Sequence, residues 1–248
     1  MELKFRTLEA EEIDCRVAQI AGNWLTLLLY KDARVDQNIL DETVGAMNWQ
    51  KKYLRDNANC IVEIWDTDKE QWVSKEDTGT ESFSEAEKGL ASDSFKRACF
   101  NWGIGRELYT APSIFILSKK EMGKKTKKLD ENGEEIYEPE FFQKDNGKYD
   151  TKTRFHVDLI RYDNKKNITD LVIKDHKGNT RFASVTKETE KELLYNMHTL
   201  LDLIKDKEEH DKKFKKENLY QFYGVENETQ LGYKDTLKAI ELLEKKDK

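Results

Sequence analysis

The sequence predicts an α+β protein, in which an antiparallel β-meander packs against a long helix, with extra β-hairpin strands and a helical C-terminal appendage. Three strand-like runs at residues 47–56, 59–66 and 71–79 follow one another with short polar connections, which is typical of a meander. A run with helical periodicity follows at 84–102, and Leu, Met and Ile recur at helical spacing from Lys187 onward.

The composition favours a folded, soluble, cytoplasmic protein. The chain has 248 residues, of which 37% are hydrophobic and 10% aromatic, so it can bury a substantial core. We find no signal-peptide pattern and no stretch of about twenty apolar residues, so no membrane partner is expected. Cys15, Cys60 and Cys99 are scattered, which indicates reduced thiols rather than a disulfide framework or a zinc site.

Three elements are expected before the meander. Residues 7–20 carry Leu8, Ile13, Val17 and Ile20 at spacings of three to five, which predicts a short amphipathic helix. Residues 23–32 are rich in Leu and aromatics and predict a strand. Residues 34–45 predict a second helix of about two turns, with Asp36 as its N-cap and Gly45 at its C-terminal end.

The predicted helix at 84–102 has two different faces. A capping box of Ser84 and Glu87 would start it, and Gly103 and Gly105 would end it. One narrow face would pack on the meander, and its residues are Ala91, Phe95, Ala98 and Trp102. The opposite side carries Gly89, Asp93, Lys96, Arg97 and Phe100. Adjacent cations such as Lys96 and Arg97 are ordinarily solvated or paired, and Asp93 stands one turn before them.

The stretch "EKGLASDSFKRACFNWGIGRELY" at 87–109, together with the earlier "RV" and "VGAMNW", resembles the annealing domain of the Rad-fifty-two family, and in particular its phage-encoded Sak-type members. The resemblance covers residues 9–112. It implies a protein that binds single-stranded DNA in a basic groove of a homo-oligomer and anneals it to a complementary strand, without catalysis or a cofactor. A phage origin would place the protein in the cytoplasm of a bacterial host.

By position in these motifs, Lys96 and Arg97 match the family's adjacent basic pair, and Arg34 matches the Arg that opens the short helix. Phe100 stands where eukaryotic members have a further basic residue, so it could stack on a base or lie in a subunit interface. Arg106 and Lys52 are further candidates, although Lys51, Lys52 and Arg55 could simply protect an edge strand.

The rest of the chain is expected to extend this domain to residue 186. The Lys-rich segment at 118–135 is a loop or hairpin tip, which either contacts DNA or confers solubility. Alternating residues at 154–186 predict additional antiparallel strands. Residues 187–248 form a helical segment whose apolar stripe is core or oligomer seam, and which in relatives can contact a single-strand-binding partner.

Charge and spacing constrain the alternatives. The net charge is −6, so any nucleic-acid site must be a local basic strip on an acidic body. One rival is a non-catalytic oligomeric adaptor that keeps the fold and uses other surfaces. Another is a metal-dependent nuclease that uses the carboxylates of "WDTDKE" and "KEDTGTE". The four histidines have no partner at ligand spacing, so no metal site or catalytic residue is predicted.

Overall fold

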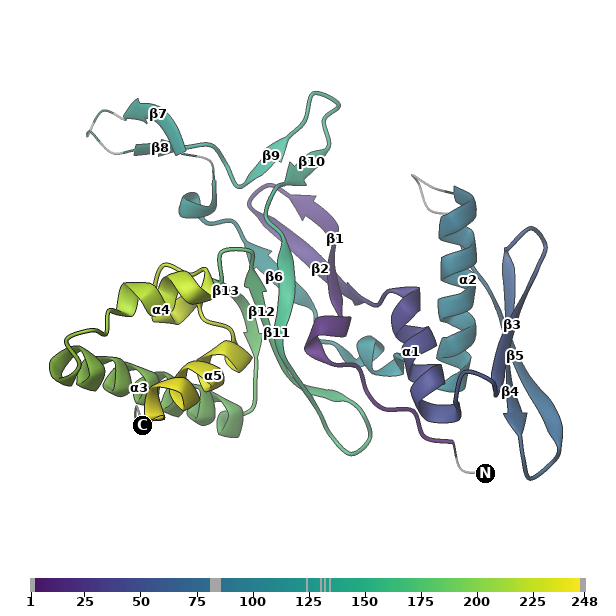
Figure 1. Ribbon diagram of the computed structural model, residues 1–248. Helices are drawn as coiled ribbons and strands as arrows, with labels where there is room; N and C mark the ends of the chain where they lie inside the picture. Colours follow the sequence, from purple (N-terminus) through teal and green to yellow (C-terminus); the bar gives the residue numbers. More distant parts are fainter. Residues whose placement is uncertain are drawn as a thin grey trace. The chain divides into compact units, whose positions relative to one another are not determined.

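The computed structural model is a mixed α+β structure, and it describes residues 3–80, 86–123, 125–129, 131, 133 and 135–245 (Figure 1). The chain divides into two compact units. Unit 1 consists of residues 1–13 and 30–111, and unit 2 of residues 14–29 and 112–248. The boundary expected at residue 186 does not separate these units, because the C-terminal helices share unit 2 with the strands before them.

Unit 1 contains the predicted meander. Strands β3 (Trp49–Leu54), β4 (Asn59–Asp66) and β5 (Gln71–Thr78) pair antiparallel in that order. Side chains alternate across the sheet, so Cys60, Val62 and Ile64 of β4 are buried on one face. The interpretation of β4 as a strand with one well-buried face is therefore confirmed.

Helix α2 (Ala86–Trp102) packs on that buried face, and Figure 1 shows it running beside the three strands. Phe95 is buried against Trp49, with ring centroids 6.2 Å apart, and Trp102 Nε1 donates a 3.0 Å hydrogen bond to the carbonyl of Val62. Gly79 lets the end of β5 approach the helix closely, since a Cβ there would lie 2.5 Å from the Ser94 nitrogen. The expected capping residue Ser84 lies outside the described residues.

Helix α1 (Ala33–Val44) contacts both α2 and β3. The predicted N-cap was wrong. Asp32 caps the helix by accepting a hydrogen bond from Arg34 N at 2.8 Å, whereas Asp36 is buried and forms an ion pair with Lys31. A cap must stand outside the first turn to accept its free N–H groups, and Asp36 lies inside that turn. Gly45 ends the helix as expected.

Unit 2 is built on a six-stranded sheet in the order β13-β12-β11-β1-β2-β6. Its two edge strands contact each other, and Arg181 of β13 donates a 2.8 Å hydrogen bond to the carbonyl of Leu117 in β6. The strands are β1 (Asp14–Ala21), β2 (Trp24–Tyr30, whose last residue belongs to unit 1), β6 (Ile114–Leu117), β11 (Phe155–Tyr162), β12 (Ile168–Asp175) and β13 (Thr180–Ser184).

The helix expected at residues 7–20 was wrong. A 3₁₀ turn, η1 (Ala10–Glu12), is followed by strand β1, which pairs with β11 through Asp14 and His156. Pairing with β11 stabilises a strand here, even though the apolar residues have helical spacing. The two-residue connection Gly22-Asn23 between β1 and β2 is a hairpin signal that would have corrected the interpretation.

Smaller elements connect these parts. The Lys-rich segment forms a hairpin, β7 (Lys125–Leu129) with β8 (Glu135–Tyr137), and a second hairpin pairs β9 (Phe141–Gln143) with β10 (Tyr149–Thr151). The turn after α2 is η2 (Arg106–Thr110), and η3 (Lys120–Met122) follows β6.

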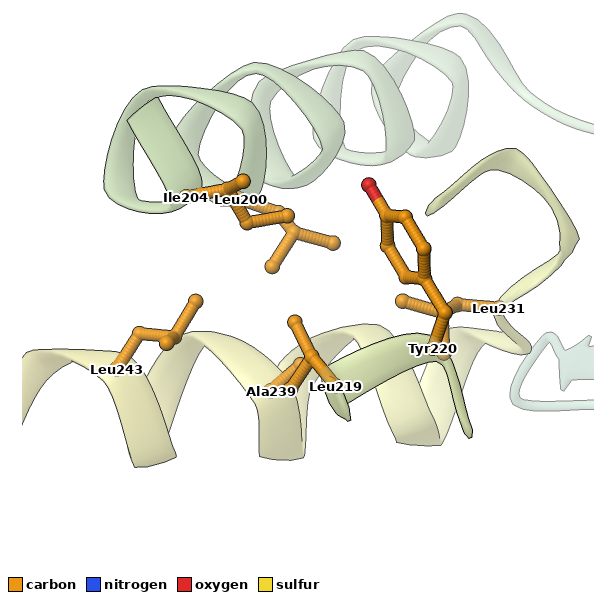
Figure 2. Packing of buried hydrophobic residues seen from close by; sticks show 7 residues of the cluster. All are labelled: Leu200, Ile204, Leu219, Tyr220, Leu231, Ala239 and Leu243. Atoms are coloured by element: carbon orange, nitrogen blue, oxygen red, sulfur yellow. The ribbon is translucent and has the colours of Figure 1, made fainter. Parts of the chain in front are cut away.

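The C-terminal segment is helical, as predicted. Helices α3 (Lys187–His210), α4 (Lys216–Tyr223) and α5 (Tyr233–Glu244), with the turn η4 (Glu228–Gln230), enclose a separate apolar cluster (Figure 2). Leu200 and Ile204 of α3 point into this cluster, while Leu194 and Leu201 of the same predicted stripe are exposed. No helix in the described ranges has the length and apolar character needed to cross a membrane.

Candidate nucleic-acid interface

Helix α2 carries the basic pair predicted from the sequence, and Arg97 of that pair reaches the meander strand β5. Lys96 is half-buried, and within the described part of the chain no acidic group lies in ion-pair distance of it. Arg97 is 50% exposed and pairs with Asp77 of β5, its Nε lying 3.2 Å from the Asp77 carboxylate. The pair is therefore accessible, with one of its two charges partly compensated.

Asp93 does not neutralise the pair. Its carboxylate instead accepts hydrogen bonds from the backbone N–H and the hydroxyl of Thr80, at 2.9 and 3.2 Å. This contact links Thr80, which follows β5, to α2. The ordinary i to i+3 or i+4 pairing considered for Lys96 and Arg97 is thus absent from the structure, and Asp77 supplies the acidic contact of Arg97 from the sheet.

Arg34 stands in the first turn of α1. Its side chain is 83% exposed and pairs with Asp32 at 2.9 Å. Hydrogen bonds from Arg34, and more weakly the charge of Lys96, hold the pKa of Asp32 below its ordinary value. The charges of Arg34 and Lys96 therefore both act on the Asp32 carboxylate at the start of α1.

A buried ion pair also lies within the electrostatic reach of Lys96. Lys31 and Asp36 are both buried and in contact, and Lys96 also acts on the Asp36 carboxylate. Burial raises the pKa of Asp36 to about 6, and the charges of Lys31 and Lys96 oppose that rise. Gly105 makes room for the Lys31 side chain, since a Cβ there would lie 2.2 Å from Lys31 Cε.

The end of α2 adds aromatic rings to the surface. Phe100 follows Lys96 by one turn, and its ring meets that of Tyr109 edge-on, with centroids 4.9 Å apart. Tyr109 is 79% exposed. Sequence reasoning missed this residue, although its place in the quoted stretch, four residues after Gly105, could have marked it.

Arg106 has a structural role that the sequence did not reveal. Its guanidinium donates hydrogen bonds of 2.7 Å to the carbonyls of Phe100 and Asn101, and it lies over the Phe100 ring at 5.6 Å from the centroid. These carbonyls belong to the last turn of α2, where the Phe100 carbonyl also accepts a 3.0 Å hydrogen bond from the backbone N–H of Gly103. Arg106 thus caps the helix, next to the left-handed Gly103 and Gly105.

Lys52 lies on the other face of the meander. Trp49 and Lys51 of β3 face α2, as their ring and cation contacts with Phe95 show, and the alternation of side chains turns Lys52 away. Lys52 forms an ion pair with Glu63 at 2.7 Å. The structure therefore does not bring Lys52 together with Lys96 and Arg97.

The acidic clusters considered for a nuclease have local partners. Asp66 accepts hydrogen bonds from the backbone of Asp68 and Lys69 in the β4–β5 turn. Asp77 contacts Arg97 and Asn101. Among the residues with described positions, no group of three or more His, Cys, Asp or Glu side chains could hold a metal ion.

Comparisons with known proteins do not extend these observations. The chain matches no protein family, no curated protein and no solved structure.

Proposed function

We propose that this protein binds single-stranded DNA along the surface formed by Arg34, Lys96, Arg97, Phe100 and Tyr109, here named the α2 surface, and anneals it to a complementary strand. One observation carries the proposal. Three cations, Arg34 of α1 and Lys96 and Arg97 of α2, are found in two contacting helices, and α2 also carries Phe100, whose ring meets the exposed ring of Tyr109. Backbone-binding cations beside stacking rings are the combination that sequence-independent single-strand binding uses.

The proposed mechanism needs no covalent chemistry. Arg34, Lys96 and Arg97 would neutralise successive phosphates, which gives affinity without sequence preference. Phe100 and Tyr109 would stack on the faces of bases and leave their Watson–Crick edges free, so that pairing itself selects the complementary strand. Because one α2 surface is short, we propose that a homo-oligomer aligns several such surfaces along the strand.

The decisive experiment is a salt titration of oligonucleotide binding. Fluorescence anisotropy of a labelled single strand gives the affinity of the wild type and of the Lys96→Ala plus Arg97→Ala variant at several salt concentrations. We expect the variant to bind on the order of tenfold more weakly, and its salt slope to be smaller by roughly 1.4, since each single-strand phosphate contact contributes about 0.7.

A matched control removes two exposed lysines from unit 2, with the variant Lys165→Ala plus Lys191→Ala. It has the same change in net charge and should keep the wild-type slope. Equal binding by the wild type and the α2 variant would refute the assignment of this pair. Absence of salt-sensitive binding by the wild type would favour the adaptor alternative.

Annealing is measured separately, by the pairing of two complementary labelled strands in the presence of a metal chelator. We expect pairing to be faster with protein than without it, and both strands to remain intact. Strand cleavage that the chelator abolishes would instead support the nuclease alternative.

A further inference from the structure

A second candidate binding site lies within unit 2. A pocket of about 210 Å³ opens where η3, the β9–β10 hairpin and the β12–β13 turn come together. The side chains that matter for its chemistry are Glu138, Phe142, Lys152, Thr153, His176 and Lys177.

Two lysines and two glutamates line the pocket. In the described ranges, neither Lys152 nor Lys177 has an ion-pair partner. The buried Glu140 at the pocket wall forms an ion pair with Arg181, which also contacts Asp175, and Glu140 accepts a 2.8 Å hydrogen bond from the Thr153 hydroxyl. Glu138 is exposed.

The pocket also combines an aromatic face with hydrogen-bond donors. Lys152 Nζ lies 6.0 Å from the centroid of the Phe142 ring, so a cation and a ring face the same space. His176 Nδ1 accepts a long 3.4 Å hydrogen bond from the backbone N–H of Arg154. In the neutral imidazole this leaves the Nε2–H as a donor.

We infer that this pocket binds one nucleotide unit, with its phosphate held by Lys152, Lys177 and His176 and its base against the Phe142 ring. The volume admits a single flat ring system with an attached anionic group. Lysine ammonium groups bind phosphate as point charges, and an aromatic face accepts any base. The choice of a nucleotide over another aromatic anion rests on the proposed function, and it gives the protein a DNA contact in unit 2 that is separate from the α2 surface.

The test uses the full chain and three small probes, namely deoxythymidine 5′-monophosphate, thymidine and inorganic phosphate. Binding is followed by the chemical shifts and saturation transfer of the probe protons, and by calorimetry for phosphate. We expect the monophosphate to bind more tightly than either thymidine or phosphate, because only it engages both the ring and the lysines.

Variants locate the binding. Lys152→Ala plus Lys177→Ala should weaken monophosphate binding at least tenfold, and Phe142→Leu should weaken it while keeping an apolar side chain at that position. Lys165→Ala plus Lys191→Ala removes equal charge elsewhere in unit 2 and should bind as the wild type does. Circular dichroism confirms that each variant is folded.

The Lys96→Ala plus Arg97→Ala variant separates this inference from the proposed function. It should lose oligonucleotide affinity and keep monophosphate binding. Equal affinities for phosphate and for the monophosphate, or unchanged binding by the Lys152 and Lys177 variant, would overturn the nucleotide pocket. Neither result would alter the oligonucleotide binding that tests the α2 surface.

Discussion

The arginines of unit 2 and the cations of the α2 surface differ in what surrounds them. Arg181 is 1% exposed, contacts the carboxylates of Glu140 and Asp175, and also donates to a backbone carbonyl. Arg161 forms a bidentate pair with Glu192 of α3, with both distances 2.8 Å. By contrast, no carboxylate of the described residues lies within ion-pair distance of Lys96, although its charge acts on Asp32 and Asp36.

This difference separates cations that hold the fold together from cations that are available to a ligand. A guanidinium whose donors are all engaged by buried carboxylates cannot contact phosphate without leaving those carboxylates unpaired. An exposed cation with one weak partner exchanges that partner at little cost, since surface ion pairs contribute about 0–1 kcal/mol. Number of partners and burial, rather than residue type, therefore separate the buried Arg181 from the cations of the α2 surface.

Of the substitutions that test this comparison, one at Arg181 should have the largest effect, and that effect is on stability. Replacing it in Arg181→Leu leaves Glu140 and Asp175 buried without their cation, which should lower the free energy of unfolding by about 3–5 kcal/mol. Urea denaturation followed by circular dichroism measures this change. Arg181→Lys, which keeps the charge, should lose less. A loss below 1 kcal/mol in Arg181→Leu would show that these carboxylates do not depend on Arg181.

The next largest effect concerns binding and should appear at Tyr109. Because stacking of a base on an aromatic ring contributes about 1–3 kcal/mol, Tyr109→Ala should weaken oligonucleotide binding roughly fivefold to a hundredfold. Tyr109→Phe keeps the ring and serves as the matched control, with an affinity near that of the wild type. Fluorescence anisotropy titrations at one salt concentration measure the oligonucleotide affinities of the two variants. If the alanine variant binds normally, the ring has no role in binding.

A smaller effect of opposite sign is expected at Asp77. Asp77→Asn removes the negative charge beside Arg97 and releases its guanidinium, so oligonucleotide binding should become a few-fold tighter, in keeping with the 0–1 kcal/mol of an exposed pair. Glu76→Gln, one residue earlier on β5 but on the other face of the sheet, removes the same charge and should have less effect. Equal gains in the two variants would mean that only net charge matters.

Elements whose sequence signals lie in neighbouring residues were predicted correctly. Alternation in β4, the short polar turn before β5 and the glycines after Trp102 all depend on near neighbours in the chain. The structure agrees with the predicted meander and with the run of C-terminal helices. These features need no knowledge of distant contacts.

Features that depend on distant partners were not predicted. Strand β1 exists because it pairs with β11, about 140 residues later, and its own spacing suggested a helix. In the same way, the sequence could not show that Arg97 pairs with Asp77 or that Arg106 caps α2. The basic pair was found because it is contiguous, whereas Tyr109 joins Phe100 only through the turn that follows the helix.

The smallest effect is expected at Lys52, and it tests which face of the meander the proposed DNA strand would follow. Because Lys52 lies on the face opposite α2 and pairs with Glu63, Lys52→Ala should change oligonucleotide affinity by less than about twofold, as expected for an exposed pair. Its salt slope should equal that of the wild type. A loss as large as that of the Lys96→Ala plus Arg97→Ala variant would place the DNA strand across the other face. Lys52 would then count among the cations that contact DNA, although it pairs with Glu63.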